Sequence, residues 1–180
     1  MEPGASVLAA AFADDPLMTY FWPRQPRRRK ALPWFWESRI ASRRKNGLVD
    51  LAHDAEGNLA CVALWEPAHV LSPTAKPLTL LRALGPSAAR ALAAGRRMEH
   101  ARPRTPHLYL AAIGTLPGAQ GRGLATELLE RRLAAAEQDC FLISNTSGTV
   151  PFYARFGFEP QAELPIGRGP VVVYPMVRRR

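Results

Sequence analysis

The sequence contains few cysteines, few lysines and no long apolar run. Its two cysteines, Cys61 and Cys140, stand alone and form no paired motif, so we expect neither a metal site nor a disulfide framework. No stretch approaches the roughly 18 apolar residues of a membrane-spanning helix. The first residues, Met1–Gly4, lack the basic start and apolar run of a signal peptide. We therefore expect a cytoplasmic protein with no membrane partner.

The chain is long enough for one domain with a sizeable core. It has 180 residues, of which 47% are hydrophobic, and no repeat or long linker divides it, so we expect a single domain over residues 1–180. Periodicity and turn residues predict an α/β (α+β) order. Expected helices cover 5–13, 33–45, 78–84, 87–101, 123–137 and 149–156, and expected strands cover 48–53, 59–65, 108–115, 140–144 and 171–177.

The charge is strongly one-sided. The chain has 24 Lys and Arg against 15 Asp and Glu, a formal net charge of +9. The basic residues are mostly arginines, clustered at 27–29, 43–44, 96–97 and 178–180. This balance suits a phosphate-bearing partner or, alternatively, an arginine-rich solvated surface. No helix-turn-helix, RNA-recognition or zinc-finger pattern is present, so we do not expect nucleic acid as the partner.

A glycine-rich turn follows the strand expected at 108–115 and leads directly into a helix. Gly118, Gly121 and Gly123 would let the backbone approach a ligand closely, and Arg122 adds a full positive charge. Successive N–H groups and the helix N-terminus predict a pyrophosphate cradle, with a tight turn that binds nothing as the alternative. The turn is neither a Walker A loop nor a dinucleotide-binding fingerprint, because the lysine and the acidic residue of those motifs are missing.

Two motifs in the second half of the chain resemble those of a known family. The segment Gln120–Ala125, QGRGLA, is similar to the pyrophosphate-binding motif of the GNAT N-acetyltransferases. The segment Val150–Phe158, VPFYARFGF, is similar to a second motif of that family, at the spacing the family uses. The closest likeness is to the branch typified by puromycin N-acetyltransferase, and the pieces that carry it are Ala9–Asp14, Arg97–Glu99, Arg102–Pro103, Pro106, Tyr109–Ala111 and Ile113–Gly114.

The resemblance implies the GNAT acyl-CoA N-acyltransferase fold. This is a central mixed, mostly antiparallel sheet, splayed where acetyl-CoA binds and flanked by helices. The implied reaction is direct acetyl transfer, in a ternary complex, from the cosubstrate acetyl-CoA to a primary amine of a small molecule such as an antibiotic or an aminonucleoside. Acetylation of a protein N-terminus or lysine, and a non-catalytic GNAT-like or nucleic-acid-associated module, are the alternatives. The sequence leaves a homodimer open.

The resemblance also assigns the acetyl-CoA contacts. Backbone N–H groups near Ala111 and Ile113 would bind the acetyl carbonyl and pantetheine, whereas their side chains are typical of strand core. The expected cofactor-binding residues are Ala111, Ile113, Gly114, Thr115, Gln120, Gly121, Arg122, Gly123, Leu124, Ala125, Thr126 and Asn145. Where the family often has an asparagine before the Phe-Tyr pair, this chain has Thr149, with Asn145 upstream.

Two catalytic residues are expected from the same resemblance. Tyr153 corresponds to the family tyrosine that protonates the departing thiolate, and a phenol with a pKa near 10 suits that exchange; a capped core tyrosine is the alternative. His107 precedes the glycine turn by a spacing similar to that of a catalytic histidine in the family. Because histidine titrates near neutrality, His107 is the expected general base, with Glu66 or a water chain as rivals.

The acceptor side and the start of the chain are less defined by sequence. Aromatic residues at 20–22 and 34–36 would border the acceptor amine or belong to the core. Asp14 and Asp15 would hold a cationic acceptor or simply end the first helix. The family usually opens with a strand before its first helix, so the first strand is expected to be missing and strand 48–53 to form an open sheet edge.

Overall fold

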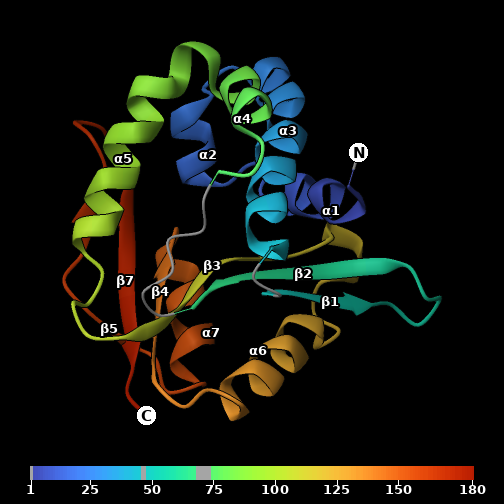
Figure 1. Ribbon diagram of the computed structural model, residues 1–180, viewed down its shortest axis with the longest axis vertical. Coiled ribbons are helices and arrows are strands. Elements are labelled where there is room, and N and C mark those ends of the chain that lie inside the picture. The colour runs from blue at the N-terminus through green and yellow to red at the C-terminus, as the bar shows by residue number, and fades with distance from the viewer. Residues whose placement is uncertain (1, 46–47, 68–73) are drawn as a thin grey trace.

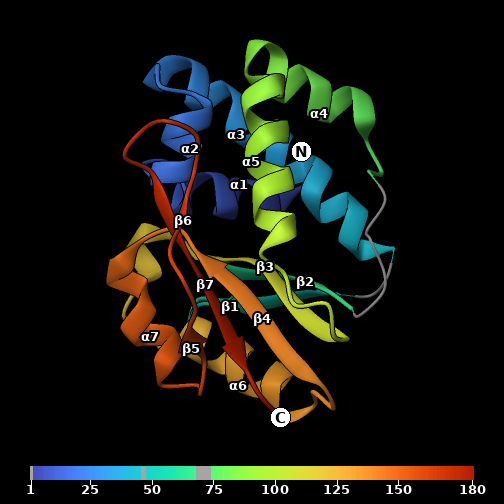
Figure 2. The same cartoon turned by 90° about the vertical axis from the view of Figure 1, so that its left-hand side faces the viewer.

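Helices cover both faces of one sheet (Figures 1 and 2) in the computed structural model, which describes residues 2–45, 48–67 and 74–180. The α-helices are α1 (Pro3–Ala11), α2 (Pro16–Phe21), α3 (Gln25–Arg44), α4 (Pro77–Leu84), α5 (Ala88–His100), α6 (Leu124–Ala134) and α7 (Val150–Ala154). The strands are β1 (Val49–His53), β2 (Leu59–Glu66), β3 (His107–Thr115), β4 (Asp139–Ser144), β5 (Glu159–Pro160), β6 (Leu164–Pro165) and β7 (Val172–Arg178). No described helix is both long and apolar enough to cross a membrane.

The strands form a sheet in the order β1-β2-β3-β4-β7-β5, with β6 also paired to β7. Among the described strands, β3 and β4 pair in parallel and the remaining pairs are antiparallel. A parallel pair needs a crossover connection, and α6 supplies it. The predicted mixed, mostly antiparallel sheet is therefore confirmed. The strand expected at 48–53 corresponds to β1, which stands at the sheet edge and pairs with β2.

The two faces of the sheet carry separate apolar cores. On β2, Val62 and Leu64 pack with the helices α1 to α3, whereas Cys61, Ala63 and Trp65 pack with α6. Successive strand residues point to opposite faces, so a strand covered on both sides must be apolar throughout. Figures 1 and 2 show α1 to α5 on one face of the sheet and α6 and α7 on the other.

The helix predicted at 33–45 begins earlier and contains a proline. It starts at Gln25, has Pro26 in its first turn and continues through Pro33 to Arg44. Pro26 fits the first turn, where an N–H has no helical partner. A proline at position 33 normally ends a helix, but the buried Leu32 and Trp36 anchor α3 in the core on either side of it. The stop predicted at residues 46–47 lies outside the described residues.

The short helix α2 was not predicted. The turn that precedes it is held in place by two side chains. Asp15 caps α2 by accepting a hydrogen bond from the Met18 backbone N–H at 2.9 Å. The buried Arg28 holds the same turn from α3, because its guanidinium donates to the Ala13 carbonyl (2.6 Å) and to the Asp14 carboxylate (3.0 Å). The turn is thereby fixed from both sides.

Part of the arginine excess is internal rather than solvated. Besides Arg28, other arginine side chains donate to main-chain carbonyls, among them Arg27 to Ala83, Arg43 to Arg39, and Arg90 to Phe21. A guanidinium offers five donors in a rigid fork, so it can join loops and helix ends that lack partners. The clusters at 27–29 and 43–44 therefore include structural residues.

Candidate active site

The sheet opens between its two central strands. The parallel pairing of β3 with β4 runs from His107↔Asp139 to Leu110↔Leu142 and stops there. On the other side of β3, the register with β2 shifts after Leu110, so that Ala111 is bulged. Beyond this point β3 and β4 separate, and main-chain groups of β3 from Ala111 onward face an opening instead of a strand. The predicted splay is present.

The glycine-rich turn brings the N-terminus of α6 to the same opening. Gly121 and Gly123 have φ values of 78° and 84°, a left-handed conformation that other residues rarely adopt. Gly123 is the N-cap of α6 and offers no side-chain cap, so the first N–H groups of the helix remain available to an anion. The Gln120 side chain donates to the Thr115 carbonyl at 3.3 Å, which ties the turn to the end of β3.

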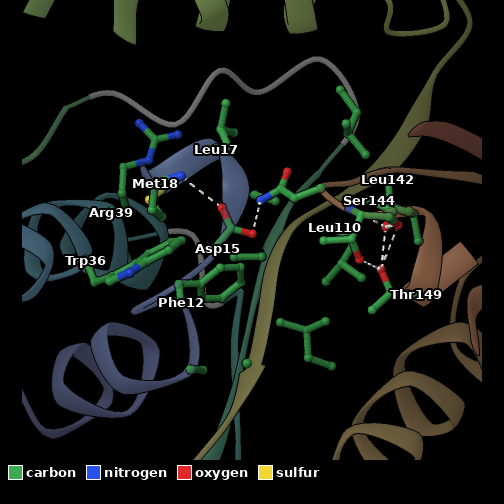
Figure 3. Close-up of a pocket in the computed structure, with 18 of the residues that line it drawn as sticks. Phe12, Asp15, Leu17, Met18, Trp36, Arg39, Leu110, Leu142, Ser144 and Thr149 are labelled. Atoms are coloured by element: carbon green, nitrogen blue, oxygen red, sulfur yellow. Dashed lines mark hydrogen bonds between the residues drawn. The ribbon is translucent and has the colours of Figure 1, made fainter. Parts of the chain in front are cut away.

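A cavity of about 1520 Å³ joins this opening to the helices on the other side. Most of the residues predicted from sequence line it, namely Ala111, Ile113, Gly114, Thr115, Gln120, Gly121, Gly123, Leu124, Ala125, Thr126, Asn145 and Tyr153. Figure 3 shows a second group of lining residues, with Phe12, Asp15, Met18, Trp36 and Arg39 gathered across the cavity from Leu110, Leu142, Ser144 and Thr149. The cavity thus has a sheet half and a helix half.

Two residues that the sequence placed in the site, His107 and Arg122, are not among those that line the cavity. Both ring nitrogens of His107 are engaged: Nδ1 lies 2.8 Å from the Thr105 carbonyl, and Nε2 lies 3.2 Å from Nε of Arg102. Burial, opposed in part by Thr105, lowers the pKa of His107. A buried imidazole with both nitrogens occupied is a poor proton acceptor for a substrate.

The rival base, Glu66, does line the cavity but is held by two arginines. Its carboxylate accepts from the buried Arg43 and, at 3.1 Å, from Arg102. Arg102 also lies over the Tyr109 ring, 4.4 Å from its centroid. These contacts occupy both carboxylate oxygens, so Glu66 joins α3 to the sheet rather than facing a ligand freely.

Asp15 is the carboxylate that faces the cavity without a cationic partner among the described residues. Its two oxygens accept from the Met18 N–H and, at 2.9 Å, from the Asn145 side chain, which comes from the end of β4. Figure 3 shows it on the side of the helix half that faces the sheet half. Burial raises the pKa of Asp15, and these hydrogen bonds oppose that rise. Asn145, expected to contact the cofactor, therefore also positions Asp15.

Tyr153 lies on α7 on the sheet side of the cavity. Its ring packs edge-on against Phe152 and Phe158, with centroids 5.2 and 6.3 Å away. Burial raises the pKa of the phenol, and the nearby Cys61 adds to that rise. The hydroxyl therefore stays protonated around neutral pH.

Gly114 gains a packing role that the sequence did not reveal. A Cβ at this position would lie 2.9 Å from the Ala11 Cβ and 3.0 Å from atoms of Leu8 and Phe12. The absence of a side chain lets α1 lie directly on β3 and brings Phe12 to the cavity wall. The predicted aromatics contribute there too: Trp36 packs 4.9 Å from Phe12 and 5.0 Å from Phe35, centroid to centroid.

Sequence reasoning placed the sheet half of this site and left most of the helix half unassigned. Trp36 and Phe35 belong to the expected aromatic group, whereas Arg39 was given no role. The signal available for Asp15 was its place in Asp-Asp-Pro, which predicts a helix N-cap as readily as a ligand contact. Its partner Asn145 lies 130 positions away, so the pair emerges only from the folded chain.

Comparison with known proteins agrees with this geometry. A family model of the acetyltransferase (GNAT) domain matches residues 88–160, which include β3, the glycine turn, α6 and α7. A solved structure described as histone acetyltransferase HPA2 and related acetyltransferase from Corynebacterium glutamicum has 26% sequence identity and a TM-score of 0.77. That match covers 98% of this chain and 88% of the other.

Two further structures share the fold at lower identity. The polyamine N-acetyltransferase of Drosophila melanogaster is 16% identical, with a TM-score of 0.65 over 97% of this chain and 92% of its own. The mosquito arylalkylamine N-acetyltransferase like 5b is 12% identical, with a TM-score of 0.54 over 98% and 95%. The match of the GNAT acetyltransferase domain model to residues 88–160, the Corynebacterium structure and the splayed sheet together support an acetyl-CoA-dependent N-acetyltransferase.

Proposed function

We propose that the chain transfers the acetyl group of acetyl-CoA directly to a primary amine of a small molecule, with both bound in one cavity. The observation that carries this proposal is the continuity of the cavity from the β3–β4 opening and the α6 N-terminus to Asp15. A shared cavity lets the amine reach the thioester without a covalent acetyl-enzyme, because the two reactants are held side by side.

The sheet half has the features that acetyl-CoA requires. The glycine turn and the uncapped N-terminus of α6 present N–H groups to the pyrophosphate. The free main-chain groups of β3 suit the pantetheine amides and the acetyl carbonyl, for which Ala111 and Ile113 are the proposed donors. Bound acetyl-CoA supplies an acetyl group activated as a thioester. N–H donors fixed in place stabilise the negative charge that develops on its oxygen.

The helix half has the features that an amine requires. Asp15 would bind the ammonium group and then accept its proton, so that a neutral nitrogen can attack. Its raised pKa makes it a better proton acceptor than an ordinary aspartate. Phe12 and Trp36 provide apolar walls for the carbon skeleton. We assign Asp15, in place of His107, as the general base.

Tyr153 is the proposed general acid. The ammonium proton that Asp15 accepts first passes on to solvent. As the new C–N bond forms and the C–S bond breaks, a second proton of the amine passes to Asp15. The phenol of Tyr153 delivers a separate proton to the sulfur of the leaving thiolate. Exchange with solvent afterwards deprotonates Asp15 and reprotonates Tyr153, so one proton is released overall. Both groups line the same cavity from opposite halves, which suits a step that removes one proton and supplies another.

The test follows free-thiol release with acetyl-CoA and a panel of amines. The panel contains an alkylamine, an arylalkylamine, the aminonucleoside puromycin and a lysine peptide. Thiol release with a small amine supports the proposal, and release with puromycin would place the chain in the branch that its sequence resembles. Activity on the lysine peptide alone would favour the protein-acetyltransferase alternative. No thiol release with any amine, together with no thermal shift on adding acetyl-CoA, would overturn the proposal.

A further inference from the structure

The charged residues that line the cavity are not all neutralised by one another. Of the lining carboxylates, Asp14 pairs with Arg28, whereas Glu66 and Glu99 both pair with Arg102. Asp15 is left with neutral hydrogen-bond partners. On the cationic side of the helix half, Arg39 lies half-buried on the wall of the cavity. Arg96 and Arg155 also line the cavity, but both are exposed. Of the lining charged groups without an ion pair among the described residues, Asp15 and Arg39 are the partly buried ones. The helix half therefore presents a partly buried negative group and a partly buried positive group to a ligand.

Arg39 has no counterion among the residues that the structure describes. Its guanidinium makes no ion pair or hydrogen bond with any side chain or carbonyl in the described part of the chain. The residues outside that part, 1, 46–47 and 68–73, include no aspartate or glutamate. Another cation lies near Arg39: burial, together with repulsion from Arg39, lowers the pKa of Arg43 to about 10. An anion beside Arg39 would relieve that repulsion.

Arg39 and Asp15 belong to the same subsite. In Figure 3 both lie in the helix half of the cavity, with Met18 beside them and Trp36 below, and the Arg39 side chain comes from α3. A partly buried charge without a counterion costs free energy, so such a site favours ligands that supply the opposite charge. A ligand with one ammonium and one carboxylate would satisfy both side chains.

We propose that the acceptor is an amine that carries a carboxylate, an amino-acid type of substrate, with its ammonium at Asp15 and its carboxylate at Arg39. The inference rests on the proposed function and names the class of its acceptor. A carboxylate fits a single guanidinium because two of its N–H groups can donate in parallel to the two oxygens. Phe12 and Trp36 would contact the carbon skeleton between the two charges.

The experiment compares amines in matched pairs that differ by one carboxylate: phenylalanine with phenethylamine, and 4-aminobutyrate with propylamine. The measured quantities are kcat/KM for thiol release and, separately, calorimetric binding of the same amines to the CoA-saturated protein. The variants are Arg39→Gln and, as a matched control, Arg29→Gln, which removes an exposed arginine of the same helix that does not line the cavity.

The expected result is a preference for the carboxylated member of at least one pair by about 10- to 100-fold, the range of one charge-assisted bond. Arg39→Gln should abolish that preference while changing kcat/KM for the plain amine less than about 3-fold. Arg29→Gln should retain the preference. Acetylation of plain amines with no preference, or a preference that survives in Arg39→Gln, overturns the inference and leaves the proposed function standing.

The binding measurement separates the two proposals. If no amine is acetylated but carboxylated amines bind and Arg39→Gln loses that binding, the carboxylate subsite stands and the proposed function fails. If neither acetylation nor Arg39-dependent binding is found, both fail.

Discussion

The two halves of the cavity recognise their ligands by different means. The sheet half offers main-chain groups: the part of β3 that is not paired with β4, the glycine turn and the N-terminus of α6. The helix half offers side chains, chiefly Asp15 and Arg39 with the aromatic rings around them. A backbone site serves one ligand common to many relatives, whereas a side-chain site can be particular to one protein. The predictions below test whether this division holds.

The largest effect is expected from the helix half, at Asp15. Asp15→Asn should lower kcat/KM roughly 1000-fold, within the range for loss of a general base. The fold should survive, because asparagine caps a helix as well as aspartate does, and its amide oxygen can still accept from the Met18 N–H. Steady-state thiol release and thermal unfolding of the variant measure the two quantities.

Asp14→Asn is the matched control for that substitution. Asp14 is exposed, and its described side-chain contact is with Arg28, so its loss should reduce kcat/KM less than about 3-fold. Equal losses in the two variants would mean that the turn, rather than the Asp15 carboxylate, carries the effect.

A somewhat smaller effect is expected in the sheet half, at Tyr153. Tyr153→Phe should lower kcat roughly 100-fold while CoA binding stays within about 3-fold, because only the proton donor is removed. Steady-state kinetics and calorimetric titration with CoA measure the two quantities. Tyr174→Phe, outside the cavity lining, is the control. Weakened CoA binding with unchanged kcat would assign Tyr153 a structural role instead.

The same division explains how much of the site was predictable. The residues of the sheet half follow one another in the chain, so a strand, a glycine turn and a helix could be read together from residues 107–134. Asp15 and Asn145 are 130 positions apart, and Arg39 resembles any other arginine of α3. No local pattern links such residues, because tertiary packing alone brings them together.

The fold shows a similar contrast. The hairpin of β1 and β2 and the helices α4 to α6 came close to their predicted bounds, because glycine, proline and apolar periodicity mark them locally. The start of α3 and the whole of α2 were missed, since Pro16 predicts the end of the first helix and Pro33 the first turn of the next. His107 was selected by its spacing and by the ordinary titration range of histidine, and the buried contacts that occupy its ring nitrogens are invisible in sequence.

The packing of α1 on β3, which joins the helix half to the sheet half, can be disrupted at Gly114. Gly114→Ala places a methyl group 2.9–3.0 Å from Leu8, Ala11 and Phe12, so the variant should lose about 1–3 kcal/mol of stability. Chemical denaturation measures the loss. Gly95→Ala, at a helical position with open space around it, should instead gain up to about 1 kcal/mol. A neutral Gly114→Ala would show that α1 moves off β3 readily.

The smallest effect is expected in how the free energy of unfolding depends on pH, through the carboxyl group of Asp15. Burial raises the pKa of Asp15 in the folded chain, so its protonated form favours folding at low pH, and that contribution is lost as the pH rises through the raised pKa. Because asparagine does not ionise, Asp15→Asn removes the decrease in stability that ionisation of Asp15 causes. Denaturation at about pH 4 and about pH 7 should therefore show the variant gaining stability relative to the wild type as the pH rises.

Asp54 is expected to change the pH dependence of stability in the opposite direction. The Asn58 backbone N–H and other local donors lower the pKa of this exposed carboxyl, so its contribution is present above the ordinary carboxyl pKa and is lost as the pH falls. Asp54→Asn should therefore lose stability relative to the wild type as the pH rises. The same trend in both variants would contradict the assignment of Asp15 as a desolvated carboxylate.

The splay of β3 from β4 has a consequence for how this enzyme tolerates mutation. A ligand held by main-chain N–H groups does not depend on which side chains the strand carries, provided that the strand keeps its path. Side-chain substitutions along β3 should then be tolerated with little effect on the binding of acetyl-CoA, as long as the new side chains fit the core. Changes at a few positions of α1 to α3 would redirect the enzyme toward new amines, so new specificities can evolve without rebuilding the catalytic sheet.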